Sequence, residues 1–99
     1  DAPCLLAACL PRELRVEDGM LEIGLITQTI CLLAYDRGLG TCIMAAAVVY
    51  ADLLRGIAGI PDDRRVVVGM ALGYPDETYP LNHFTRPRAS WEEFTRWVE

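Results

Sequence analysis

The sequence predicts an α+β fold, and three segments carry that prediction. Residues 66–73 begin with three valines and stay apolar to Gly73, which is typical of a central β-strand. Pro3 to Leu10 is an apolar run of strand length, although its spacing also allows a helix. From Met20 to Asp36, apolar residues recur at helical spacing. Strand, helix, helix, strand and tail in this order indicate an α+β arrangement.

The chain length of 99 residues suits one small domain and leaves no room for a second. We expect a core of strands and helices over residues 1–78, and an extended tail with a terminal helix over residues 79–99. When glycine is counted in place of tyrosine, about 57% of the residues are apolar, above the roughly 45–50% of soluble chains. This surplus predicts a large buried interface.

The first long helix is expected from Met20 to Asp36, after a charged connection over residues 12–17. Asp18 offers a carboxylate that can cap the exposed amides of this helix. Apolar residues on nearly every face predict that the helix is buried on most sides. Gly38 can adopt the left-handed conformation that closes a helix.

Small and apolar residues follow this helix. Thr41 to Met44 is short and apolar, and the three alanines at 45–47 allow another backbone or a flat ligand to come close. A short helix is expected from Asp52 to Ala58, ended by Gly-Ile-Pro at residues 59–61. The predicted strand of residues 66–73 comes next.

The carboxy-terminal segment is expected to leave the sheet through a turn at residues 74–77 and to run extended from Tyr79 to Arg88. A helix should follow from Ser90 to Trp97, because Ser90 and Glu93 have the spacing of a capping box. Its aromatic stripe predicts docking onto a core or a partner subunit rather than stacking on a cofactor. The stripe consists of Trp91, Phe94 and Trp97.

The charge balance disfavours a general nucleic-acid surface. With 9 Lys and Arg against 14 Asp and Glu, the net charge is −5, whereas phosphate backbones require concentrated positive charge. Both of the longest uncharged stretches are shorter than the ~18 apolar residues that suggest a membrane span. The first residues lack the basic start of a secretory signal. We therefore expect a cytoplasmic protein that binds neither nucleic acid nor membrane.

The four cysteines, at positions 4, 9, 31 and 42, form no C-x-x-C pair and sit in apolar surroundings. We expect core thiols rather than disulfides or metal ligands. With one histidine in the chain, there are few ligands for a zinc site of mixed Cys and His ligands. That histidine, His83, is expected in a turn or on the surface rather than as a general acid.

Four short motifs occur in a specific order along the chain. They are Ala2-Pro3, Gly38-Leu39-Gly40-Thr41, Gly59-Ile60-Pro61 and Gly73-Tyr74-Pro75-Asp76. Each motif alone is weak, but the ordered set is specific. With this order of motifs, the chain resembles the nitroreductase family from its first residues almost to its end.

The resemblance implies a nitroreductase-like half-domain, with helices packed on a small mixed or antiparallel sheet and FMN as the cofactor. The family ends with a basic R-x-R or K-x-R element, which Arg86-Pro87-Arg88 matches. The match implies that Arg86 and Arg88 hold the FMN phosphate, and guanidinium groups do fork onto phosphate oxygens. Without the motif order, two nearby arginines also fit a solvated loop.

The segment after Gly40 resembles the family stretch that lies against the isoalloxazine ring of FMN. In this chain the residues concerned are Ile43, Met44, Ala45 and Ala46. The resemblance implies a backbone amide near the reactive ring nitrogen, where it would stabilise negative charge on the reduced ring. Apolar side chains at 43 and 44 would shield the ring from water. Plain core packing is the alternative explanation for the same residues.

The activity implied by the resemblance is that of an FMN-dependent NAD(P)H oxidoreductase. Hydride from NADH or NADPH would reach the flavin, and a nitro compound, quinone or similar acceptor would then be reduced. No side chain is expected to act as a catalytic nucleophile or base, because the flavin carries the chemistry. Family members are usually dimers with flavin at the subunit boundary, so we expect a homodimer or a complementary chain.

Further FMN ligands of the family lie upstream of the position that Asp1 occupies. They are an Arg-Arg-Ser/Thr-x-Arg element and an asparagine. We therefore expect the chain to supply at most half of the pocket, either as a fragment of a longer enzyme or beside another chain that brings the rest. The alternative from another class is a structural or interaction module that has lost flavin binding.

Overall fold

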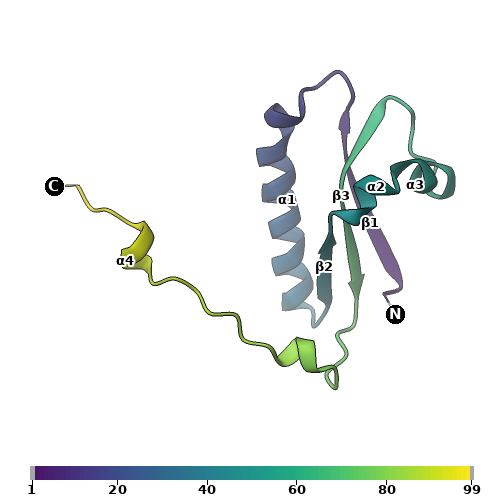
Figure 1. Cartoon of the computed structure of the whole chain (residues 1–99). Coiled ribbons are helices and arrows are strands. Elements are labelled where there is room, and N and C mark those ends of the chain that lie inside the picture. The colour runs from purple at the N-terminus through teal and green to yellow at the C-terminus, as the bar shows by residue number, and fades with distance from the viewer. Residues whose placement is uncertain (1, 99) are drawn as a thin grey trace.

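The structure is a computed structural model that describes residues 2–98 (Figure 1). Its elements in chain order are β1 (Cys4–Pro11), α1 (Val16–Asp36), β2 (Gly40–Met44), α2 (Ala46–Val49), α3 (Ala51–Ala58), β3 (Arg64–Gly73), the 3-10 helix η1 (Pro80–His83) and α4 (Trp91–Phe94). The predicted α+β class is confirmed, and both predicted strands are present. Among the residues described, none of the helices combines the length and the apolar character that crossing a membrane requires.

β3 lies at the centre of a three-stranded antiparallel sheet with the strand order β1-β3-β2. The prediction of a central strand over residues 66–73 is confirmed, and β3 begins slightly earlier, at Arg64. Its β-branched residues suit this place, because a central strand has neighbours on both edges and packed side chains on its faces. The small antiparallel sheet also agrees with the fold that the family resemblance implies.

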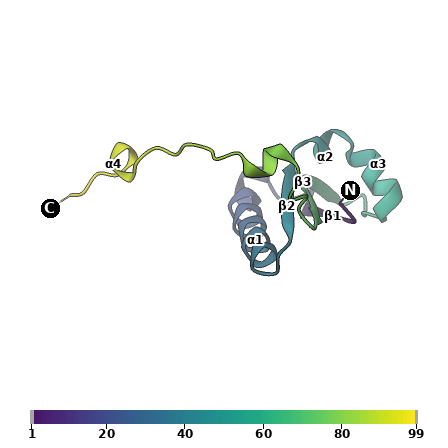
Figure 2. The same cartoon turned by 90° about the horizontal axis from the view of Figure 1, so that it is seen from below.

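Helices lie on both sides of the sheet, α1 on one side and α2 with α3 on the other (Figure 2). On the α1 side, Gly19 packs against the side chain of Leu10 in β1. On the other side, Ala47 of α2 packs against Gly69 of β3. The buried apolar residues come from these same elements and are Leu10, Ala34, Ala47, Val66 and Met70. This core is small, and many apolar side chains of the helices stay exposed.

α1 starts earlier and is more exposed than the sequence predicts. It begins at Val16, and Asp18 lies within its first turn instead of capping it. The side chains of Arg15 and Asp18 form an ion pair of 2.8 Å there, and this contact lowers the pKa of Asp18. The prediction of burial on most sides is wrong, because a sheet on one side can cover only one face of a helix. The exposed apolar residues of α1 include Leu21, Leu25 and Leu32.

Two glycines close helices in the left-handed conformation. α1 ends at Asp36 as predicted, and Gly38 has a φ angle of 70°. α3 ends at Ala58, and Gly59 has a φ angle of 63°. A side chain would be strained at either position, so these glycines determine where the chain turns toward β2 and toward β3.

Two arginines hold the loop between α3 and β3. Arg55 of α3 donates a hydrogen bond of 2.8 Å to the carbonyl oxygen of Pro61, and a second one to that of Arg64. From the other side, Nε of Arg12 donates to the carbonyl oxygen of Asp62 at 2.6 Å. The loop is therefore tied both to α3 and to the end of β1, which fixes where β3 starts.

The tail beyond β3 is exposed from Tyr74 to Val98 and runs past α1, away from the sheet (Figure 1). Glu93 accepts a hydrogen bond of 3.1 Å from the backbone N–H of Ser90, as the predicted capping box requires. α4 nevertheless spans only Trp91–Phe94, and the rest of the predicted helix to Trp97 does not form. A helix of so few turns is marginal when no other element packs against it. The rings of Trp91 and Trp97 meet edge to face, with centroids 6.4 Å apart, and both residues remain exposed.

Candidate functional site

The segment Ile43–Ala46 lies where β2 ends and α2 begins. Two backbone pairs hold it to the central strand, Ile43 with Met70 and Met44 with Gly69. The side chain of Ile43 is 55% exposed, both alanines are exposed, and Met44 is half-buried. The four predicted residues thus form one continuous surface of small and apolar groups at the β2–α2 junction.

A cavity of about 350 Å³ adjoins this junction, between α1 and the sheet. Its walls are formed by Met20, Ile23, Gly24, Thr27, Gln28, Ile43, Ala45, Val48, Val67 and Val68. Val67 and Val68 both line it, since a register shift leaves Val67 without a partner on β1. A mostly apolar wall with a few polar groups is what pockets for small molecules usually offer.

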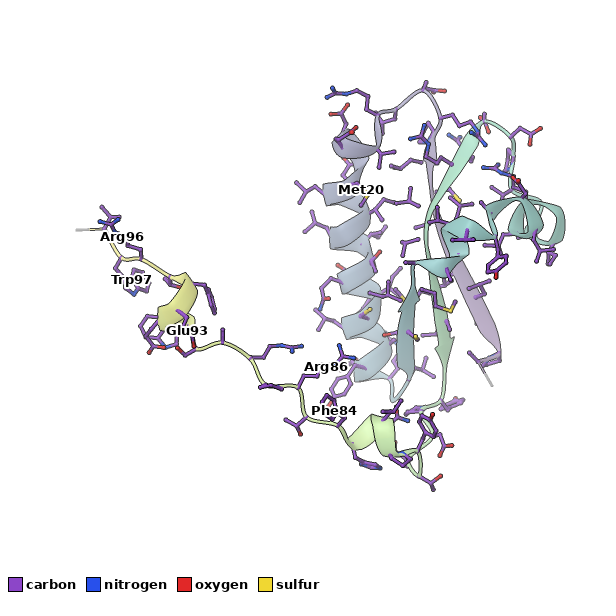
Figure 3. The ribbon with its side chains drawn as sticks, in the orientation of Figure 1. Met20, Phe84, Arg86, Glu93, Arg96 and Trp97 are labelled. Carbon is purple, nitrogen blue, oxygen red and sulfur yellow. The ribbon has the colours of Figure 1, made fainter. Side chains whose placement is uncertain are left out.

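Arg86 and Arg88 lie on the exposed tail, not at the β2–α2 junction. Figure 3 shows Arg86 just beyond Phe84, with Arg96 and Trp97 farther along the same segment. Nη1 of Arg88 donates to the neighbouring carbonyl oxygen of Pro87 at 3.5 Å, and within residues 2–98 neither arginine has a salt bridge. Both guanidinium groups are therefore available to an anion, but the chain does not bring them to the junction.

Three of the four sequence motifs meet at one end of the sheet, a convergence that the sequence did not reveal. Gly40 pairs with Gly73 across β2 and β3. A Cβ atom at Gly73 would lie 2.8 Å from Cδ of Pro3, and one at Gly40 would lie 3.5 Å from Cβ of Pro75. Gly73 therefore leaves no room for a side chain beside Pro3, whereas a Cβ atom at Gly40 would be in ordinary contact with Pro75. The recurrence of glycine in the motifs was the available indication of this contact.

A second cavity of about 270 Å³ opens at this end of the sheet. Its lining residues are Ala2, Gly40, Thr41, Cys42, Ala71, Gly73, Tyr74, Pro75, Asp76 and Asn82. The hydroxyl group of Thr78 donates to Asp76 at 2.7 Å, and its backbone N–H does so at 2.9 Å. Both contacts lower the pKa of Asp76. The sequence places Asp76 in a motif and in a turn, but spacing along the chain does not indicate that it lines a cavity together with Gly40.

The cysteines differ from the predicted core thiols. All four are free, but Cys4 and Cys42 are exposed and the other two are only half-buried. The reason is the small core, which leaves the outer strands, with Cys4, Cys9 and Cys42, and the helix α1, with Cys31, partly uncovered. No cluster of His, Cys, Asp and Glu in residues 2–98 is arranged to hold a metal ion. His83 lies at the end of η1, where Nε2 is 2.7 Å from the carbonyl oxygen of Glu77, in the turn role that the sequence predicts.

The fold is similar to that of solved FMN-dependent nitroreductases. The chain matches the FMN-dependent nitroreductase NfnB from Mycobacterium smegmatis, solved in complex with NADPH, with a TM-score of 0.89 and 28% identity. It matches the FMN and NADPH-dependent nitroreductase NfnB from Sphigopyxis sp. strain HMH with a TM-score of 0.87, also at 28% identity. Each match covers 99% of this chain, but 43% and 44% of the respective solved chain.

Sequence comparison gives the same family. The chain is 36% identical over 98 residues to the chloronitrobenzene nitroreductase of Comamonas testosteroni and to the nitrobenzene nitroreductase of Ectopseudomonas oleovorans. Both alignments cover 99% of this chain and 43% of the relative, so the chain spans under half the length of the proteins it matches. The model of the Nitroreductase family matches residues 1–74, which is most of the chain. This chain therefore belongs to the nitroreductase family.

Proposed function

We propose that the chain forms part of an FMN-dependent oxidoreductase, in which hydride from NAD(P)H is passed on to a nitro compound, a quinone or a similar acceptor. Part of the flavin site is supplied by a segment outside this chain or by another chain. The observation that supports this most is the likeness to nitroreductases over nearly the whole chain, since two relatives are named for nitrobenzene substrates and two solved neighbours for FMN and NADPH.

The residues present suit the two ends of FMN by their chemistry. Arg86 and Arg88 offer two guanidinium groups that have no carboxylate partner within residues 2–98, which is the donor set that a phosphate monoester prefers. The segment Ile43–Ala46, exposed except for the half-buried Met44, offers a backbone edge with two alanines and apolar side chains, against which a flat ring can lie. FMN, when bound, supplies the hydride and electron chemistry.

In this proposal the protein binds, orients and shields. The arginines hold the phosphate end, and Ile43 and Met44 keep water from one side of the ring. A backbone N–H at the junction stabilises negative charge on the ring, as a fixed donor costs no reorganisation. No side chain of the chain acts as nucleophile or base. A cytoplasmic location remains a prediction.

A partner subunit is part of the same proposal. Half or more of the side-chain surface of Leu21, Leu25 and Leu32 on α1 is exposed, and solvent exposure of so many leucines on one helix is unfavourable. We propose that a second copy or a complementary chain covers this helix and completes the flavin site. The exposed aromatic residues of the tail suit the same interface.

The proposal is tested with the chain in its native polypeptide. We expect the purified protein to carry or take up FMN, and to oxidise NADPH faster when nitrobenzene is added. Protein that binds no FMN, even when FMN is added in excess, would contradict the proposal. That result would favour the alternative of an interaction module without flavin. If the protein binds FMN but does not oxidise NAD(P)H, the assignment of FMN as cofactor stands and the proposed reaction is wrong.

A further inference from the structure

Gly69 of β3 and Ala47 of α2 are in unusually close contact. A Cβ atom built on Gly69 would lie 2.5 Å from Cβ of Ala47, closer than two carbon atoms can approach without a shift. It would also lie 3.6 Å from the carbonyl oxygen of Met44, the last residue of β2. Gly69 therefore touches both sides of the β2–α2 junction, because Met44 precedes Ala45 and Ala46, and Ala47 follows them.

The position of α2 depends on this contact. α2 spans only Ala46–Val49, and a single helical turn has little stability of its own. Ala47 is its one buried residue, with 7% of its surface exposed. Since the methyl group of Ala47 rests directly on a residue without a side chain, α2 lies as close to β3 as the backbone allows.

We propose that Gly69 is a positioning residue for the flavin-facing segment Ile43–Ala46. It sets the depth at which α2 rests on β3, and so the place of the backbone between Met44 and Ala47. This inference rests on the proposed function, because it assigns to Gly69 the placement of the segment that would lie against the isoalloxazine ring. A side chain at position 69 would push α2 outward and move that segment relative to the ring.

The test compares four variants of the native polypeptide with added FMN as the probe. Gly69→Ala should weaken FMN binding about tenfold, as overpacking of a tight contact does, and change the visible circular dichroism of the bound flavin. Combining Gly69→Ala with Ala47→Gly moves the methyl group from α2 to β3 and should restore affinity to within about twofold of the parent. Ala47→Gly alone should weaken binding about threefold, since it loosens α2.

Gly56→Ala is the matched control. Gly56 lies in α3, and a Cβ atom there would meet nothing within 4 Å. This variant adds the same methyl group without a contact, so its FMN affinity and flavin spectrum should equal those of the parent.

Each outcome decides the inference. If Gly69→Ala lowers thermal stability but leaves FMN affinity and the flavin spectrum unchanged, Gly69 serves stability alone and the inference is wrong. If Gly69→Ala does not fold, the other two variants still test the inference. Unchanged FMN binding in Ala47→Gly, or lost FMN binding in the double variant, would overturn it. If the parent itself binds no FMN, the proposed function fails first, which is a distinct result.

Discussion

The guanidinium group of Arg55 in α3 donates a hydrogen bond of 2.8 Å to the carbonyl oxygen of Pro61. A second bond from the same group reaches the carbonyl oxygen of Arg64, where β3 begins. The Arg55 side chain is only 12% exposed, and the acceptor on Arg64 is partly buried, whereas the acceptor on Pro61 lies at the surface. One side chain thus connects a helix with the first residue of the central strand.

Replacing Arg55 by alanine should destabilise the protein. The change leaves two carbonyl oxygens without their charged donor and should cost about 2 kcal/mol of unfolding free energy. In a thermal melt, the midpoint should fall by roughly 10 °C. Arg96→Ala in the exposed tail is the control and should leave the midpoint unchanged. Equal midpoints for the two variants would show that the loop does not depend on Arg55.

Two glycines of α1 should respond oppositely to alanine. A Cβ atom at Gly19 would lie 2.5 Å and 2.7 Å from the two methyl carbons of Leu10, which is buried. A Cβ atom at Gly24 would meet nothing within 4 Å. Gly24→Ala should therefore gain up to about 1 kcal/mol in helix propensity, whereas the overpacking in Gly19→Ala should cost about 1–3 kcal/mol against the same gain. Denaturant unfolding measures both, and equal changes would contradict the packing of α1 on β1.

Charge reversal at Arg86 and Arg88 tests the phosphate assignment. If both guanidinium groups hold the FMN phosphate, the double change to glutamate should weaken FMN binding by at least about 100-fold, because two charge-assisted hydrogen bonds are lost. The measurement is a fluorescence titration of FMN against the native polypeptide. Arg96→Glu supplies the control, since it reverses a charge on the same tail without touching the R-x-R element. Unchanged affinity in the double variant would reject these two residues as phosphate ligands.

The turn after β3 should depend on pH through Asp76. The hydroxyl group and then the backbone N–H of Thr78 lower the pKa of the Asp76 carboxyl group. A carboxyl group with a lowered folded pKa contributes stability above its unfolded pKa of about 3.9, and this contribution is lost as the pH falls through the folded value. An NMR titration should place the Asp76 midpoint below that of an unfolded aspartate. Thr78→Val should raise it and Thr78→Ser should not, and a midpoint that ignores both changes would contradict the contact.

The regular elements near the sheet could be predicted from local sequence. The valine-rich, continuously apolar run of residues 66–73 indicated a central strand, because β-branched residues favour strands and a strand buried on both faces stays apolar throughout. Gly38 marked the end of α1, because glycine adopts the left-handed conformation there without the strain that a side chain would cause. By contrast, the start of α1 at Val16 was not predicted, and neither was the packing of Gly19 near that end of α1 against Leu10 of β1, a contact between two elements that spacing along the chain does not encode.

The candidate site was predictable only in part. The sequence identified Ile43, Met44, Ala45 and Ala46 as a group, and the structure keeps them together at one junction. It did not indicate α2, because four small and branched residues have no helical pattern of their own. Whether Arg86 and Arg88 reach the same ligand stays a prediction, since the place of an exposed tail depends on what packs against it.

In the part of the chain that the structure describes, the sheet has two outer strands, β1 and β2, each paired only with β3. Within residues 2–98, the outward N–H and C=O groups of these strands meet no further strand. Such rows are templates for pairing between copies, which leads to aggregation when nothing blocks them. Residues 1–99 expressed alone should therefore be poorly soluble. Co-expression with the polypeptide that covers β1 and β2 should restore their solubility.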